Sequence, residues 1–203
     1  MISEQAKQRM RELAARYPAA RSAVMPALYI AQDEEGYITQ DALEAVAEAI
    51  GMTVDDVESI ATFYTMYYQR PPGKKVIKVC TSISCYLRNC DALVERLEQR
   101  LDIKRGETSD DGNYTLLTAE CLASCGTAPV LQVNGEFVDN VTLDMADKLV
   151  DRWQKELASV GPRPGTPDSP LTDSEDAASE KQAAIARRRQ FISPLNRDFI
   201  KES

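Results

Sequence analysis

Four of the five cysteines stand in two short clusters, each directly after a strand-like run. Cys80 and Cys85 enclose four residues, and Cys121 and Cys125 enclose three. Because each pair follows a strand, the four thiols are expected to meet at neighbouring strand ends, where they could close around one soft metal centre. The rest of the chain offers no other recognisable reactive site, so any chemistry is expected here.

The all-cysteine set leaves several kinds of site open. It suits an iron–sulfur cluster or a structural zinc ion. Zinc ribbons usually have about two intervening residues in at least one pair, so the longer gaps here favour iron–sulfur. Disulfides are less expected where thiols are kept reduced, and a thioredoxin-type dithiol would need Cys-x-x-Cys, which the sequence lacks.

Neither loop between paired cysteines contains an acidic residue, although Glu120 directly precedes Cys121. Cys90, the fifth cysteine, is predicted to be a buried, inert residue within a helix; as a spare ligand it would require the loop to rearrange. Gly126 is expected to let backbone N–H groups approach the cluster. Further hydrogen bonds to an anionic cluster are expected from nearby hydroxyls: Thr81, Ser82, Ser84, Ser124 and Thr127.

Composition excludes several classes of function. The chain has no histidine, which removes zinc sites with imidazole ligands, Rieske clusters, haem with a proximal histidine and serine–histidine nucleophiles. Its net charge of −8 argues against binding nucleic acid, which requires a basic surface. Neither a membrane-spanning apolar run nor a signal sequence is recognisable. A cytoplasmic location is therefore expected.

Residues 1–72 are predicted to form a helical domain. Helices are expected over 3–17 and 23–31, over 39–50 with Gly51 as C-cap, and from the Thr53 cap onward. An apolar stripe on the last helix is predicted to pack in the core, with docking on a partner as the alternative. The stripe consists of Val57, Ile60, Phe63, Tyr64 and Tyr67.

Residues 73–160 are predicted to form a small α/β sandwich with the order β-α-β-β-β-α. Strands are expected at 75–79 and 114–118, and the Asn134-Gly135 turn indicates a hairpin between 130–133 and 136–138. The connecting helix is predicted over 87–101, with Leu87, Val94, Leu97 and Leu101 inward. A final helix follows from Thr142, with Met145, Leu149 and Trp153 on one side.

Residues 161–203 are predicted to be a linker and tail. Four prolines with many serines and acids indicate a disordered segment as far as Gln182. A basic end follows that includes Arg187-Arg-Arg189. An unstructured terminus and a peptide that docks on a partner are both compatible with this composition.

The sequence resembles the 24-kDa-type subunit of NADH:quinone oxidoreductase (respiratory complex I), among the thioredoxin-like [2Fe-2S] ferredoxins. The resemblance covers roughly residues 10–158. It rests on Tyr17 to Leu28, on Ala61-Thr-Phe-Tyr-Thr-Met-Tyr, on the Cys80/Cys85 pair with Leu87-Arg-Asn after it, and on Glu120-Cys-Leu-Ala-Ser-Cys-Gly-Thr-Ala-Pro129.

The resemblance implies the fold and the cofactor. The fold would be α+β, with an N-terminal helical bundle before a thioredoxin-like [2Fe-2S] domain, in which Ala128-Pro129 is a candidate cis peptide. Cys80, Cys85, Cys121 and Cys125 would hold one binuclear cluster. That cluster would exchange single electrons with an FMN and store one beside the flavin, off the main route to quinone.

The resemblance also implies partners. FMN and NADH would bind a partner flavoprotein subunit, with the N-terminal helices clasping it, and the complex would lie on the cytoplasmic side of the inner membrane. The absence of a glycine-rich dinucleotide loop agrees with that division of labour. Formate dehydrogenases and NAD-reducing hydrogenases share the pattern. A zinc-stabilised module and a freestanding ferredoxin are also compatible with the cysteine set.

Overall fold

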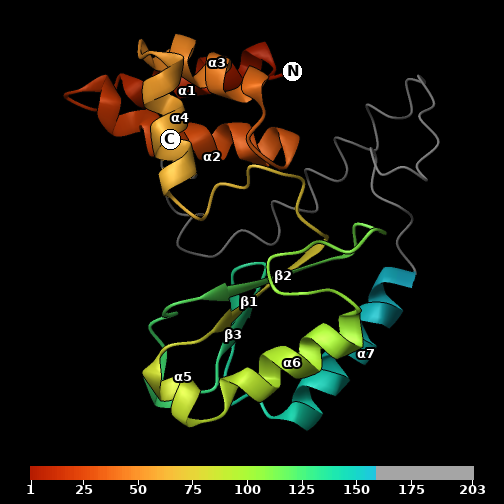
Figure 1. Cartoon of the computed structure of the whole chain (residues 1–203). Helices are drawn as coiled ribbons and strands as arrows, with labels where there is room; N and C mark the ends of the chain where they lie inside the picture. The colour runs from red at the N-terminus through yellow and green to blue at the C-terminus, as the bar shows by residue number, and fades with distance from the viewer. Residues whose placement is uncertain (159–203) are drawn as a thin grey trace. The chain divides into compact units, whose positions relative to one another are not determined.

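A computed structural model describes residues 1–158 of the chain. The chain divides into two compact units, Met1–Pro71 and the residues from Pro72 onward (Figure 1). This division lies one residue before the one expected from the sequence. The predicted tail, 161–203, lies outside the described residues.

The first unit is helical. Its elements are α1 (Glu4–Ala14), the 3-10 turn η1 (Ala20–Ala23), α2 (Val24–Glu35), α3 (Gln40–Ile50) and α4 (Val54–Phe63). Fully buried side chains from all four α-helices form one core, among them Met10, Leu28, Val46 and Val57. α1 is shorter than predicted because Pro18 disfavours helix in the residue before it. α2 is longer, since its C-cap is Gly36 at φ 88°.

Helix caps explain where these helices start. The hydroxyls of Ser3, Thr39 and Thr53 accept hydrogen bonds from the backbone N–H groups of Ala6, Ala42 and Asp56. Each bond satisfies a donor that would otherwise have no partner in the first turn. Gly51 ends α3 in the left-handed conformation (φ 68°), as predicted.

One member of the predicted apolar stripe is not in the core. Val57 and Tyr67 are buried, but Phe63 is 77% exposed. α4 ends at Phe63, and Tyr64 is already extended (ψ 116°). Phe63 is within α4, six residues after Val57, so at about 100° per residue it lies about 120° around the helix from that buried side chain.

The second unit is a four-stranded mixed sheet with helices packed on it. It contains β1 (Lys75–Cys80), α5 (Ile83–Leu87), α6 (Cys90–Leu101), β2 (Tyr114–Ala119), the 3-10 turn η2 (Cys125–Thr127), β3 (Leu131–Val133), β4 (Glu136–Val138) and α7 (Leu143–Ala158). The strand order is β2-β1-β3-β4. β1 and β2 run parallel, and the other neighbours are antiparallel.

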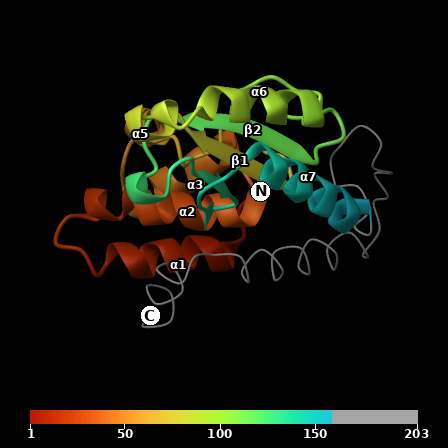
Figure 2. The ribbon, with the colours of Figure 1, turned by 90° about the horizontal axis from the view of Figure 1, so that it is seen from below.

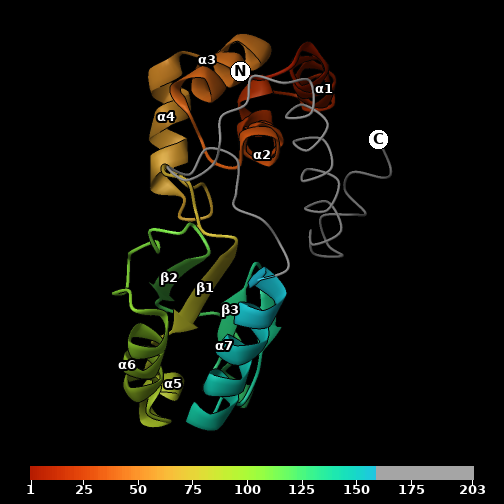
Figure 3. The same ribbon diagram turned by 90° about the vertical axis from the view of Figure 1, so that its right-hand side faces the viewer.

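The core of this unit lies between the sheet and the α6–α7 pair (Figure 3). Ile77 and Val79 of β1 face it together with Leu116, Leu131 and Trp153. Because side chains alternate along a strand, Cys80 belongs to the other face of β1. The Asn134-Gly135 turn has positive φ at both residues, which gives the predicted hairpin.

The helix predicted over 87–101 begins only at Cys90, as α6, and Leu87 belongs to the preceding short helix α5. Asn89 adopts φ 66°, which an asparagine tolerates better than most residues, and it separates α5 from α6 (Figure 2). Leu87 consequently faces solvent and is 76% exposed. Met145 on α7, also predicted to lie on the apolar side, is 37% exposed.

Candidate metal centre

Cys80 is held at the end of the central strand. Its backbone N–H donates to the carbonyl of Val130 (3.0 Å), and the following N–H, of Thr81, donates to the carbonyl of Ala119 (2.9 Å). Both neighbouring chain segments therefore fix the backbone at this point. The Cys80 side chain is 3% exposed.

Cys85 and Cys90 come from the two helices that follow β1. Cys85 lies in α5 and Cys90 is the first residue of α6. Both are buried, in one apolar cluster with Cys80, Ala128 and Val130. The α5–α6 break thus brings Cys90 close to the predicted ligands, and its 0% exposure agrees with a packed thiol.

Cys121 and Cys125 lie in the loop after β2, and both are exposed. Ala123, between them, has φ 59°, a conformation that costs a non-glycine residue roughly 1 kcal/mol. Its N–H donates to the Cys121 sulfur (3.3 Å). The loop conformation thus aims a backbone donor at a predicted ligand.

Asp139 anchors the other end of this loop. The Thr127 hydroxyl donates to the Asp139 carboxylate (2.7 Å), and the Ser124 hydroxyl lies 2.8 Å from the Thr127 hydroxyl. The N–H of Asn140 also donates to the Thr127 carbonyl (2.7 Å). Sequence reasoning missed Asp139, because nothing in its local pattern signals a contact 12 residues away.

Several of the five hydroxyls predicted as donors to a cluster are hydrogen-bonded within the chain. Thr81 donates its hydroxyl to the Ala119 carbonyl (3.2 Å), and Thr127 donates to Asp139. A hydroxyl has only one proton to give. The backbone N–H of Ala123 donates to the Cys121 sulfur, and backbone groups of Ser82, Leu122 and Val130 act to lower the pKa of the Cys80 and Cys85 thiols.

The predicted cis peptide between Ala128 and Pro129 is present. The Pro129 carbonyl accepts a hydrogen bond from the N–H of Val141 (2.9 Å). The segment between the second cysteine pair and β3 is thereby joined to the start of the α7 region.

The buried thiols differ in acidity. Burial raises the pKa of Cys80, but N–H groups of Ser82 and Leu122 and the neighbouring thiols outweigh it, so the net pKa lies below the ordinary value. Burial, followed by the Cys80 thiol, raises the pKa of Cys85. Within this group Cys80 is therefore the first to become a thiolate, the form that binds metals.

The structure places three of the four predicted ligands in one neighbourhood. Cys80 lies near both Cys85 and Cys121, whose thiols contribute to lowering its pKa, whereas Cys125 lies on the exposed turn η2. Within residues 1–158 no three His, Cys, Asp or Glu side chains stand ready as a metal-ion site. The donor chemistry nevertheless fits an iron–sulfur group: the clustered side chains are thiols, and the nearby Asp139 is engaged by Thr127.

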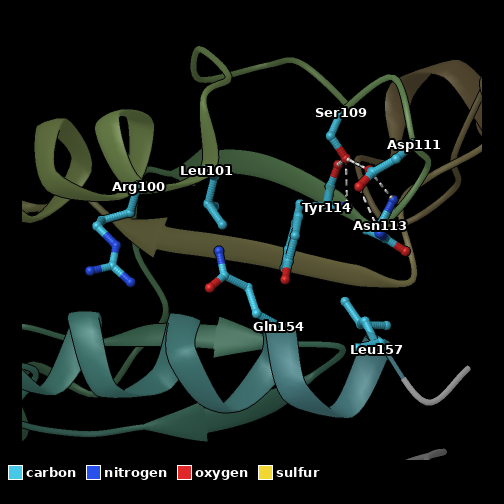
Figure 4. A pocket seen from close by; sticks show the side chains of 9 residues that line it. Arg100, Leu101, Ser109, Asp111, Asn113, Tyr114, Gln154 and Leu157 are labelled. Atoms are coloured by element: carbon cyan, nitrogen blue, oxygen red, sulfur yellow. Dashed lines mark hydrogen bonds between the residues drawn. The ribbon is translucent and has the colours of Figure 1, made fainter.

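A separate cavity of about 380 Å³ lies at the far end of the sheet from the cysteines (Figure 4). It is bordered by Tyr114 at the start of β2 and by Gln154 and Leu157 on α7. On its rim, the Asp111 carboxylate accepts hydrogen bonds from the Ser109 hydroxyl and from the side-chain N–H of Asn113. The cavity contains none of the predicted ligands.

Among residues 1–158, none of the helices combines the length and the apolar character that a membrane span requires.

The fold and the cysteine arrangement define a ferredoxin of the thioredoxin type. Residues 10–154 match the thioredoxin-like [2Fe-2S] ferredoxin family, and the chain belongs to this family. A segment of an NAD+-reducing [NiFe]-hydrogenase has a similar fold, with a TM-score of 0.60 and 19% identity, covering 68% of this chain and 24% of that one.

Two similar curated relatives are named as one component of NADH-quinone oxidoreductase, the subunit designated "E". The Mycobacterium tuberculosis protein is 41% identical over 161 residues, covering 79% of this chain and 62% of its own length. The Rhizobium meliloti protein, designated "E 2", is 43% identical over 141 residues, covering 70% and 84%. The chain thus spans less than two thirds of the mycobacterial relative and most of the rhizobial one.

Proposed function

We propose that Cys80, Cys85, Cys121 and Cys125 bind one [2Fe-2S] cluster, and that the chain is the iron–sulfur subunit of the NADH-oxidising part of NADH:quinone oxidoreductase. The observation that carries this proposal is the placement of two cysteine-bearing segments at one end of the parallel β1–β2 pair: Cys80 ends β1 and packs with Cys85, and Cys121 follows β2. The naming of relatives at 41–43% identity as NADH-quinone oxidoreductase subunits supports the choice of complex.

The residues of this chain would give the site three properties. First, β1 and its neighbours fix Cys80, so the ligand positions are set by the sheet rather than by a free loop. Second, the N–H groups of Ser82, Leu122, Ala123 and Val130 would stabilise negative charge on sulfur, which favours the reduced form and raises the reduction potential. Third, each bound thiol must lose its proton, and the raised pKa of Cys85 makes that proton the hardest to remove.

A bound cluster would supply one-electron transfer, so the chain would exchange electrons singly with an FMN. The FMN and NADH are assigned to a partner flavoprotein, because this chain has no glycine-rich dinucleotide loop. In this proposal the chain is an oxidoreductase subunit without a nucleotide site of its own. The complex would lie on the cytoplasmic side of the bacterial inner membrane, with the N-terminal helices contacting the flavoprotein.

An equivalent subunit of an NAD-reducing hydrogenase or formate dehydrogenase is the second candidate. The observation that favours it is the structural similarity to the NAD+-reducing [NiFe]-hydrogenase. At 19% sequence identity, that similarity indicates a shared fold alone. Co-purification with the remaining subunits of the parent complex would separate these assemblies.

Visible absorption and low-temperature EPR of the purified chain, before and after dithionite, test the cluster. We expect a brown protein that gains a rhombic spin-½ signal on reduction, with iron and sulfide in equal amounts. A colourless, EPR-silent protein with stoichiometric zinc would refute electron transfer and leave a structural module.

A further inference from the structure

Asn134, in the turn between β3 and β4, holds the start of β1 with its side-chain amide. Its Oδ1 atom accepts a hydrogen bond from the backbone N–H of Val76 (2.8 Å), and its Nδ2 atom donates to the backbone carbonyl of Lys74 (3.0 Å). The β1–β3 ladder itself ends at the Ile77–Val133 pair. These two bonds, called the Asn134 clamp from here on, therefore continue the pairing of β1 beyond the ladder.

The clamp residue also begins the only Asn-Gly sequence of the chain. In such a sequence the backbone nitrogen of glycine can attack the side-chain carbonyl carbon of asparagine, because glycine has no Cβ to hinder the approach. A C–N bond forms and closes a succinimide ring, while the amide nitrogen leaves as ammonia. Water then opens the ring and leaves aspartate or isoaspartate, so the reaction needs no reagent other than water.

Burial does not protect this sequence from the reaction. Asn134 and Gly135 are both exposed, and a Cβ at Gly135 would meet no atom within 4 Å. Water therefore reaches the turn freely. The feature that opposes the reaction is the clamp, because it directs the amide toward β1 and engages both of its polar atoms.

We propose that Asn134 is a deamidation site controlled by the fold, whose amide reacts only while the β3–β4 hairpin is separated from the start of β1. The reaction rate is then the rate of a free Asn-Gly sequence multiplied by the fraction of time that the hairpin is open. Because the β1–β3 ladder has only three residue pairs, local opening costs less than unfolding of the whole unit. This inference goes beyond the proposed function and does not depend on a bound cluster.

The products of the reaction cannot restore the clamp. Aspartate keeps an oxygen that can accept from Val76, but its second oxygen would face the Lys74 carbonyl, and both of these groups are acceptors. Isoaspartate adds a methylene group to the main chain inside a turn that holds both of its residues at positive φ. Deamidation is therefore irreversible and weakens the hold on β1, the strand that ends at Cys80.

The first test compares the deamidation rate of the folded chain with that of the free peptide 129–139. The peptide is the unprotected reference, since an isolated hairpin is marginally stable at best in water. Peptide mapping by mass spectrometry follows the mass increase at Asn134 with time, at one pH and temperature. We expect the folded chain to react at least about tenfold more slowly than the peptide, and the urea-unfolded chain to react at the peptide's rate.

Two outcomes of this comparison would overturn the proposal. Equal rates in the folded chain and the peptide would show that the clamp gives no protection. Slow reaction in the urea-unfolded chain would show that the neighbouring sequence, rather than the fold, limits the rate.

The second test asks whether the amide stabilises the hold on β1. Asn134→Asp reproduces the aspartate product, and Asn140→Asp is the matched control: Asn140 is also exposed, its φ is 50° against 52° for Asn134, and its hydrogen bond to Thr127 is made by the backbone N–H. Urea unfolding is followed through the fluorescence of Trp153, which is buried in the core of the second unit. We expect the unfolding equilibrium constant to rise about tenfold in Asn134→Asp and to stay near the wild-type value in the control.

Equal effects of the two substitutions on unfolding would overturn the stabilising role of the amide. An Asn134→Asp chain that does not fold, beside a folded Asn140→Asp control, would support that role. The rate comparison on the wild-type chain tests the protection of Asn134 in either case.

Discussion

Gly73 is the position where one added methyl group should damage the second unit most. A Cβ on Gly73 would lie against the carbonyl carbon of Tyr114, 2.7 Å from the Thr115 nitrogen and 2.8 Å from the Tyr114 Cα. All three atoms belong to the backbone of β2, which pairs with β1 along its whole length. Neither strand can therefore yield without disturbing the ladder that positions Cys80.

The cost of Gly73→Ala can be worked out from two contributions. Overpacking against a fixed backbone costs about 1–3 kcal/mol. The N–H of Gly73 also donates to the buried Thr115 hydroxyl at 2.6 Å, and leaving that donor without a partner costs about 1–3 kcal/mol. We expect a loss of about 3 kcal/mol in the free energy of unfolding, or a melting temperature lower by roughly 15 °C for a domain of this size.

Denaturant unfolding followed through Trp153 fluorescence measures this loss. Trp153 is the only tryptophan of the chain and is buried in the core of the second unit, so the signal reports that unit alone. Gly126→Ala is the control, since a Cβ at Gly126 would meet no atom within 4 Å. A Gly73→Ala variant within about 1 kcal/mol of both the control and the wild type would refute the reasoning.

Three further predictions concern the site and the helical unit. Cys80→Ser should remove or severely alter the cluster, whereas Cys90→Ser should keep it, and assays of bound iron and sulfide in each variant measure this. A Cys90→Ser variant without iron would overturn the ligand assignment. Thr127→Val removes the donor to Asp139, so we expect several-fold faster loss of iron to a chelator, and an unchanged rate would contradict the anchoring role. Burial raises the pKa of Tyr67 above its ordinary value of 10.0, so the unfolded phenol ionises first and stability should fall above about pH 10. In the Tyr67→Phe variant the urea midpoint, followed by circular dichroism, should fall less steeply with pH. Near neutral pH the variant should lose about 1 kcal/mol of unfolding free energy, because the hydrogen bond to the Met25 carbonyl is lost. An equally steep fall in the variant would show that Tyr67 is not the source of the pH dependence.

Local patterns predicted the parts of the fold that local interactions decide. The caps at Thr39 and Thr53, the Gly51 stop and the Asn134-Gly135 hairpin each depend on bonds and dihedral angles within a few residues. Such features are written into neighbouring residue types. The order of strands and helices in the second unit follows from the same kind of pattern.

Periodicity was a poor guide where a helix ended or broke. Phe63 and Leu87 belong to predicted apolar stripes, yet both are exposed: Phe63 is the last residue of α4, at the edge of its stripe, and Asn89 separates Leu87 from the helix to which it was assigned. An apolar residue past such a point can face either way, and only the packing around it decides. At α5 that packing turns Cys85 inward and three apolar side chains outward.

The sequence by itself determined which atoms could bind the cofactor: four thiols in two pairs, without a histidine to compete. The tertiary structure decided how those thiols differ. Cys80 and Cys85 are covered while Cys121 and Cys125 are exposed, the sulfur donors are backbone N–H groups, and Asp139 holds the second loop. These outcomes depend on contacts between segments far apart in the chain, which residue spacing cannot encode.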